Sequence, residues 1–128
     1  MDAPVTRPHK PVKLDDGAFE ALPFPALIEQ VRKEPAFADA GRSGLTLVRD
    51  PAMTVVLTVM RAGATLAEHR APGPITVVVL EGSISFASGA RRTTLRQGMG
   101  AVCARGLPHT VEAIEDTAFL IILGGAGA

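Results

Sequence analysis

From Gly44 onward the chain consists of short runs of β-type residues that alternate with turns, and this rhythm restricts the possible folds more than any other feature. The segments between the runs contain Gly, Pro or Asp, which turns favour. Many short strands at this spacing are typical of a β-sandwich or barrel rather than of βαβ units. The predicted strands are Leu45–Val48, Thr54–Met60, Ile75–Leu80, Ser83–Phe86, Arg92–Leu95, Gly100–Cys103, Thr110–Ile114 and Ala118–Leu123.

A different pattern precedes these runs. Pro25 suits the first turn of a helix, and Pro35 is expected to end that helix. A helix this short is not stable alone, so we expect its apolar side to pack against the main body. Four apolar residues fall at helical spacing in this segment, namely Phe24, Leu27, Ile28 and Val31.

Length and composition indicate one domain. A chain of 128 residues with 47% apolar content is long enough to bury its own core. We assign this domain to residues 14–123, with a flexible Pro-rich arm at 1–13 and a flexible tail at 124–128. His9 is predicted to be a solvated residue of the arm. The tail is rich in glycine, but no helix follows it to complete a phosphate-binding loop.

Charge and composition disfavour several classes of partner. The 13 basic residues balance the 13 acidic ones, and the chain has no Trp or Tyr, so we expect no nucleic-acid partner. The longest apolar runs are too short to span a membrane. The first residues lack the apolar segment of a secretory signal, and the single Cys103 cannot form an internal disulfide, so we expect a cytoplasmic protein.

The stretch from Gly63 to Gly82 resembles the first sequence motif of the cupin superfamily, whose members are small jelly-roll barrels. Gly63, His69 and Gly82 stand at the spacing of that motif. Metal-binding members have a second histidine and a glutamate in the same motif. Here those two positions hold Ala71 and Ile75.

A later stretch resembles the second motif of the same family. Gly98, Gly106 and His109 stand at its spacing, while Ala104 replaces a proline and Ala113 replaces an asparagine. Each motif alone is loose. Together and in order, separated by alternating strands and turns, they make a more specific match that covers residues 45–123.

The resemblance implies an all-β fold, a double-stranded β-helix of the jelly-roll type, here with one short N-terminal helix. It also implies a pocket between the two sheets and a homodimer, which exposed strand edges favour as well. In metal-binding members the pocket holds one divalent ion such as Zn, Fe, Ni, Mn or Cu, and His69 and His109 would be its ligands here. The implied pocket residues are His69, Ala71, Ile75, Cys103 and His109.

The implied metal site lacks a third protein ligand, which catalytic sites usually have. Because side chains alternate along a strand, we expect His69 and Ala71 to face one way and Glu68 and Arg70 the other, so Glu68 cannot simply substitute. Cys103, Glu112 and a carboxylate from elsewhere in the chain are candidates, although Cys103 lies in an apolar strand and is better explained as a packed side chain.

Three hypotheses about function follow. The first is a protein that binds a small organic molecule in its barrel pocket. The second is a metal-dependent enzyme, similar to dioxygenases or isomerases of the family, that uses His69 and His109. The third is a structural or regulatory homodimer. Arg61 and Arg70 flank the first motif and are candidates for binding a carboxylate, although solvated arginines are the commoner outcome.

Overall fold

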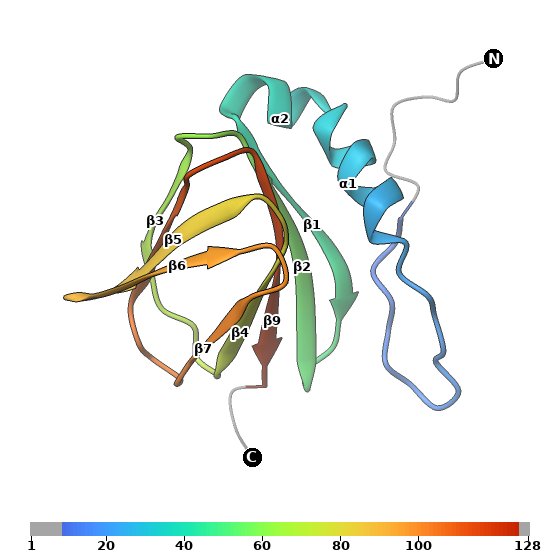
Figure 1. The fold of residues 1–128 in the computed structure, drawn as a ribbon. Helices are drawn as coiled ribbons and strands as arrows, with labels where there is room; N and C mark the ends of the chain where they lie inside the picture. The colour runs from blue at the N-terminus through green and yellow to red at the C-terminus, as the bar shows by residue number, and fades with distance from the viewer. Residues whose placement is uncertain (1–8, 126–128) are drawn as a thin grey trace.

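The structure, a computed structural model, describes residues 9–125, which form two helices and nine strands. Figure 1 shows two sheets that face each other, with the helices on one side. The helices are α1 (Phe24–Arg32) and α2 (Pro35–Ala40), and the strands are β1 (Arg42–Arg49), β2 (Met53–Met60), β3 (Thr65–His69), β4 (Ile75–Glu81), β5 (Ser83–Ser88), β6 (Arg91–Arg96), β7 (Gly100–Cys103), β8 (His109–Ala113) and β9 (Thr117–Gly124).

The two sheets have the order of a jelly roll. The larger sheet runs β1-β2-β9-β4-β7 and the smaller one runs β3-β8-β5-β6, with antiparallel pairing between neighbouring strands. Consecutive strands therefore often lie in different sheets. The predicted all-β barrel with two facing sheets is confirmed. Strand β3 was absent from the predicted runs because its five residues are mostly exposed and show little alternation.

The space between the sheets is filled by inward-facing side chains from both. In β4, for example, Ile75, Val77 and Val79 are buried while the residues between them are partly exposed, as a period of two requires. Phe119 of β9 is fully buried and is among the largest of these side chains. The core residues are Met60, Ala71, Ile75, Val77, Val79, Ile84, Phe86, Leu95, Cys103, Val111, Ala113 and Phe119.

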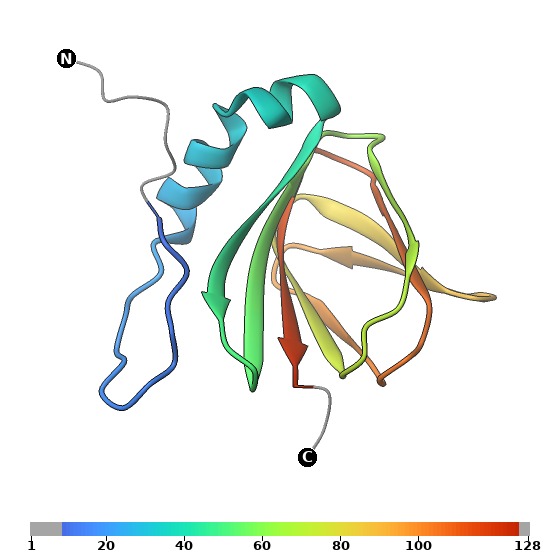
Figure 2. The ribbon, with the colours of Figure 1, turned by 180° about the vertical axis from the view of Figure 1, so that it is seen from behind.

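Helix α1 covers the outer face of the larger sheet. Its buried residues Leu27, Ile28 and Val31 pack against apolar side chains from β1, β2 and β9. Figure 2, which shows the molecule from behind, places α1 on the β1 side and away from the smaller sheet. This packing confirms that the short helix rests on the main body. It leaves the opposite side of the barrel, where β5, β6 and β7 meet, uncovered by helices.

Pro35 was predicted only to end the first helical segment. It also begins α2, which is a second role. Glu34, the residue before it, is extended with ψ 145°, as expected before a proline. Pro35 then occupies the first turn of α2, where no backbone N–H is needed. Gly41 ends α2 in the left-handed conformation with φ 72°. The N-terminal region therefore has two helices.

The N-terminal arm is attached to β1 where the structure describes it; residues 1–8 of the predicted arm lie outside the described residues. Val12 forms a parallel bridge with Val48. The Nε2 atom of His9 lies 3.0 Å from the carbonyl oxygen of Leu47 and forms a hydrogen bond with it. His9 is half-buried, so the expectation of a solvated histidine is wrong.

The predicted tail is partly ordered. Gly124 is the last residue of β9, and the N–H of Gly125 donates to the carbonyl oxygen of Ala52 at 2.9 Å. Residues 126–128 of the tail lie outside the described residues. Within residues 9–125, no helix is long and apolar enough to cross a membrane.

Candidate functional site

His69 and His109 meet at the end of the β3–β8 pair. The two residues are Cα partners across these strands, and their Nε2 atoms lie 3.0 Å apart. The rings are 4.1 Å apart between centroids and meet edge to face. His109 is 3% exposed, whereas His69 is exposed. The pair is therefore open to solvent on the His69 side only.

Hydrogen bonding determines which nitrogen of His109 carries the hydrogen. Its Nδ1 lies 3.2 Å from the carbonyl oxygen of Leu107, and a carbonyl oxygen only accepts, so Nδ1 must donate. In the neutral ring Nε2 then presents a lone pair, directed at Nε2 of His69. His69 must offer a hydrogen at that position, or the two rings must share a cation.

The environment favours the neutral form of His109. Burial lowers the pKa of His109, because desolvation penalises the imidazolium; the hydrogen bond to Leu107 opposes this shift and the charge of nearby His69 adds to it. A neutral imidazole with its Nδ1–H held by a carbonyl oxygen is the form that binds metal ions. His109 is thus suited both to accepting a hydrogen bond and to metal ligation.

The donor set fits a metal ion in part. Two Zn–N bonds of about 2.0–2.1 Å at a tetrahedral angle place their nitrogens about 3.3 Å apart, close to the 3.0 Å between the two Nε2 atoms. However, no three His, Cys, Asp or Glu side chains within residues 9–125 are grouped so that they could hold a metal. Glu112 is exposed between two buried neighbours of β8, and Cys103 lies in the core. Neither candidate joins the histidine pair, so we derive no catalytic step.

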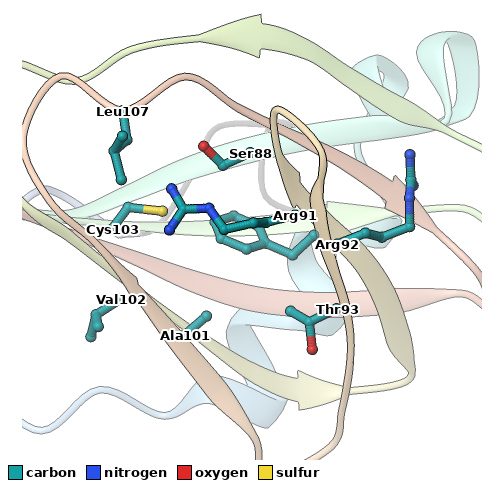
Figure 3. Close-up of a pocket in the computed structure, with 9 residues that line it drawn as sticks. Ser88, Arg91, Arg92, Thr93, Ala101, Val102, Cys103 and Leu107 are labelled. Atoms are coloured by element: carbon teal, nitrogen blue, oxygen red, sulfur yellow. The ribbon is translucent and has the colours of Figure 1, made fainter.

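A cavity of about 190 Å³ lies between the edge strands of the two sheets. Figure 3 shows the side chains around it, with the guanidinium of Arg91 and the thiol of Cys103 directed toward the same space. The larger hollows along residues 10–22 are lined by neither His69 nor His109. The cavity is lined by Phe86, Ser88, Arg91, Arg92, Thr93, Ala101, Val102, Cys103 and Leu107.

Phe86 connects the cavity with the histidine pair. Its ring lines the cavity and stacks on the ring of His109 at 5.9 Å between centroids and 29° between planes. Phe86 and His109 come from β5 and β8, which are neighbours in the smaller sheet. A ligand in the cavity would therefore contact a side chain that packs directly on His109.

The other residues predicted for the pocket lie in the barrel core. Ala71 and Ile75 are 7% and 3% exposed, and both belong to the same buried cluster as Cys103. Strand β3 ends at His69, so strand alternation does not determine where the Ala71 side chain points. Of the predicted pocket residues, only Cys103 is among the side chains that line the cavity.

The arginines that line the cavity differ from those suggested by the sequence. Arg61 lies over the ring of Phe37 at 5.3 Å, and Nη1 of Arg70 donates to the carbonyl oxygen of Gly106 at 3.1 Å. Arg91 lines the cavity instead. Its position next to the turn of a β-hairpin carries no signal of a binding role, because hairpin arginines are ordinarily solvated.

Comparison with known families agrees with the fold. The family described as "Cupin domain" matches residues 56–123, which is more than half of the 128 residues. This chain belongs to the cupin family. A search of curated proteins found no match.

Solved structures show the same barrel in proteins of low identity. A conserved protein of unknown function from Streptococcus pyogenes is 21% identical with a TM-score of 0.65, over 70% of this chain and 78% of that one. An RmlC-like cupin from Desulfovibrio desulfuricans is 24% identical with a TM-score of 0.64, over 72% of this chain and 90% of that one. A cupin 2 conserved barrel domain protein from Leptotrichia buccalis is 28% identical with a TM-score of 0.62, over 65% of this chain and 40% of that one. These likenesses support the fold and assign no ligand.

Proposed function

We propose that this cupin binds a small organic molecule in the cavity between β5, β6 and β7. The observation that carries the proposal is the cavity itself, whose walls are mainly apolar with a few polar groups, as in ligand sites generally. Its volume of about 190 Å³ exceeds the roughly 150 Å³ of an engineered protein cavity that binds benzene. The cavity also argues against a purely structural role, which would be better served by a filled barrel.

The test is a titration of the full chain with a library of small organic molecules, followed by amide chemical shifts in NMR spectra. We expect shifts that cluster on β5, β6 and β7. Ala101→Leu adds apolar volume to the cavity wall and should abolish these chemical-shift changes. Ala67→Leu makes the same substitution at an exposed position of β3 and should leave the changes as they are in the unmodified protein. Absence of any binding, or equal binding by both variants, would refute the proposal.

A metal centre at His69 and His109 is a second candidate, favoured by the 3.0 Å approach of the two Nε2 atoms. A divalent ion bound there would act as a Lewis acid, while the chain itself supplies two imidazoles and, through Leu107, the orientation of one of them. The remaining ligands would be water, since neither histidine lines the cavity proposed for the organic molecule.

Elemental analysis of the purified protein tests this second candidate. We expect one ion per chain in the unmodified protein and its loss in His69→Ala and His109→Ala. His9→Ala is the matched control, because His9 is the third histidine of the chain and bonds to Leu47 outside the barrel. Metal-free protein, or metal retained in both site variants, would exclude a metal centre at this pair.

A further inference from the structure

The side chain of Arg91 has no hydrogen-bond or ion-pair partner within the part of the chain that the structure describes. Arg91 begins β6 at the hairpin that joins it to β5, and its guanidinium points from this strand into the cavity (Figure 3). Its neighbour Arg92, by contrast, donates to Oγ of Ser85 at 2.9 Å. Arg91 is therefore the arginine of this wall that remains available to a ligand.

The polar groups of the cavity favour an anion. Besides the two arginines, the lining offers the hydroxyls of Ser88 and Thr93, and it contains no Asp or Glu among residues 9–125. The chain has a formal net charge of zero, so this positive charge is a local feature. Arg91 is exposed, so its guanidinium is solvated in the free protein, and a partner that supplies both negative charge and acceptors would form charge-assisted hydrogen bonds with it.

The shape of the guanidinium distinguishes between anions. Its parallel N–H groups match the two oxygens of a carboxylate. Within residues 9–125 the cavity lining includes no helix, so it has none of the helix N-termini that frequently hold phosphates. One free arginine and two hydroxyls thus fit a single carboxylate better than a phosphate.

The rest of the cavity suits a compact apolar group. Phe86, Ala101 and Leu107 contribute apolar surface to it, and Phe86 is only 5% exposed. The volume of about 190 Å³ accommodates a ring or a branched chain the size of benzene, which occupies a cavity of roughly 150 Å³.

We propose that the cavity binds a small monocarboxylate with an aromatic or branched apolar body, whose carboxylate is held by Arg91 and whose body packs against Phe86. This inference rests on the proposed function and narrows it to one chemical class. It assigns to Arg91 a role in specificity: the arginine selects the acid over its neutral analogues.

Calorimetric titration with matched acids and amides tests the inference. The probes are benzoate with benzamide, 3-methylbutanoate with 3-methylbutanamide, and cyclohexanecarboxylate with its amide. We expect at least one acid to bind about tenfold or more tightly than its amide, since a charge-assisted hydrogen bond contributes that much. Arg91→Met, which keeps the apolar part of the side chain, should remove this preference. Arg91→Lys should restore only part of it, because the planar fork is lost.

Arg96→Met is the matched control, since Arg96 is an exposed residue of the same strand that does not line the cavity. It should leave the acid preference unchanged. Amides that bind as tightly as the acids would overturn this inference while the proposed function stands. A preference that survives in Arg91→Met would overturn it as well. If none of the six probes binds, this inference is refuted, and the library titration then decides the proposed function separately.

Discussion

The Nε2 atoms of His69 and His109 lie 3.0 Å apart although 40 residues separate them in the chain. The register of β3 and β8 places the two residues opposite one another, and the Leu107 carbonyl directs the lone pair of His109 toward its partner. The pair therefore accepts a single hydrogen or a single cation between its rings.

Acidification should destabilise the metal-free protein through His109. Burial lowers the pKa of His109 in the folded protein. In the unfolded chain the pKa of His109 is close to its ordinary value of about 6.5, which is higher. Between these two pKa values the unfolded state holds more protons, and stability therefore falls as the pH is lowered through this window. Urea unfolding midpoints from pH 8 to pH 5, measured with a chelator present, should show this decline.

A comparison of two histidine variants isolates the contribution of His109. His109→Asn retains a donor for the Leu107 carbonyl but cannot titrate, so its unfolding midpoint should depend less on pH. His9→Asn should keep the full dependence, because the pKa shift arises at His109. An unchanged pH slope in His109→Asn would show that another group is responsible.

Two glycines of the cupin motifs should differ in their sensitivity to substitution. Gly63 and Gly82 both have positive φ, 87° and 76°. A Cβ at Gly63 meets open space, whereas a Cβ at Gly82 collides with the backbone carbonyl of Asp116. Gly63→Ala should cost about 1–2 kcal/mol of unfolding free energy, the strain of the left-handed conformation. Gly82→Ala should cost more than about 3 kcal/mol, because the backbone must move.

Chemical denaturation of both glycine variants checks this difference. Gly82→Ala is expected to express poorly or to unfold at much lower denaturant concentration. Similar losses of unfolding free energy in the two variants would contradict this prediction. They would mean that the backbone at Asp116 moves to accommodate the new Cβ at little cost.

Packing of α1 should depend on apolar burial far more than on its ion pair. Ile28 is 2% exposed, so Ile28→Ala should destabilise the protein by about 2–5 kcal/mol. Nη2 of Arg32 lies 3.0 Å from Oε1 of Glu81, with side chains 28% and 42% exposed, and solvent screens such a pair. Arg32→Met should therefore cost less than about 1 kcal/mol. Thermal or urea unfolding measures both, and a larger loss in Arg32→Met would contradict the argument.

Phe86 should be important for both stability and the histidine pair. It is 5% exposed and stacks on His109, so Phe86→Ala should cost about 3–5 kcal/mol. It should also shift the imidazole resonances of His109 in NMR spectra. Phe19→Ala removes the same side chain from a position that is 95% exposed and should change stability by less than about 0.5 kcal/mol. Unaltered His109 resonances in Phe86→Ala would argue against the stacking contact.

The strands and turns could be largely predicted because their signals are local. Run Gly100–Cys103 coincides with β7, and run Ile75–Leu80 differs from β4 only by Glu81. Strand β3 was not predicted, because its five residues are mostly exposed and therefore lack an alternation of apolar and polar side chains. Helix α2 was not predicted, because Pro35 was interpreted as the end of a helix although proline also favours the first turn of one.

The candidate site was predictable in its two histidines and in Cys103, which was predicted for the pocket and lines the cavity. Spacing within two motifs identified His69 and His109, and their meeting depends on the pairing of β3 with β8. The place of the cavity and the position of Arg91 in its wall could not be predicted from the sequence, because the walls come from β5, β6 and β7 of two different sheets. The homodimer and the bound metal stay predictions.

The sequence by itself determined the local features of this protein, namely its strands, its glycine turns and the two motif histidines. These follow from alternation and backbone sterics within a few residues. Only the tertiary structure decided which side chains face one another, since sheet order and register join distant segments. It placed Arg91 and Cys103 around one cavity, with Phe86 between that cavity and His109.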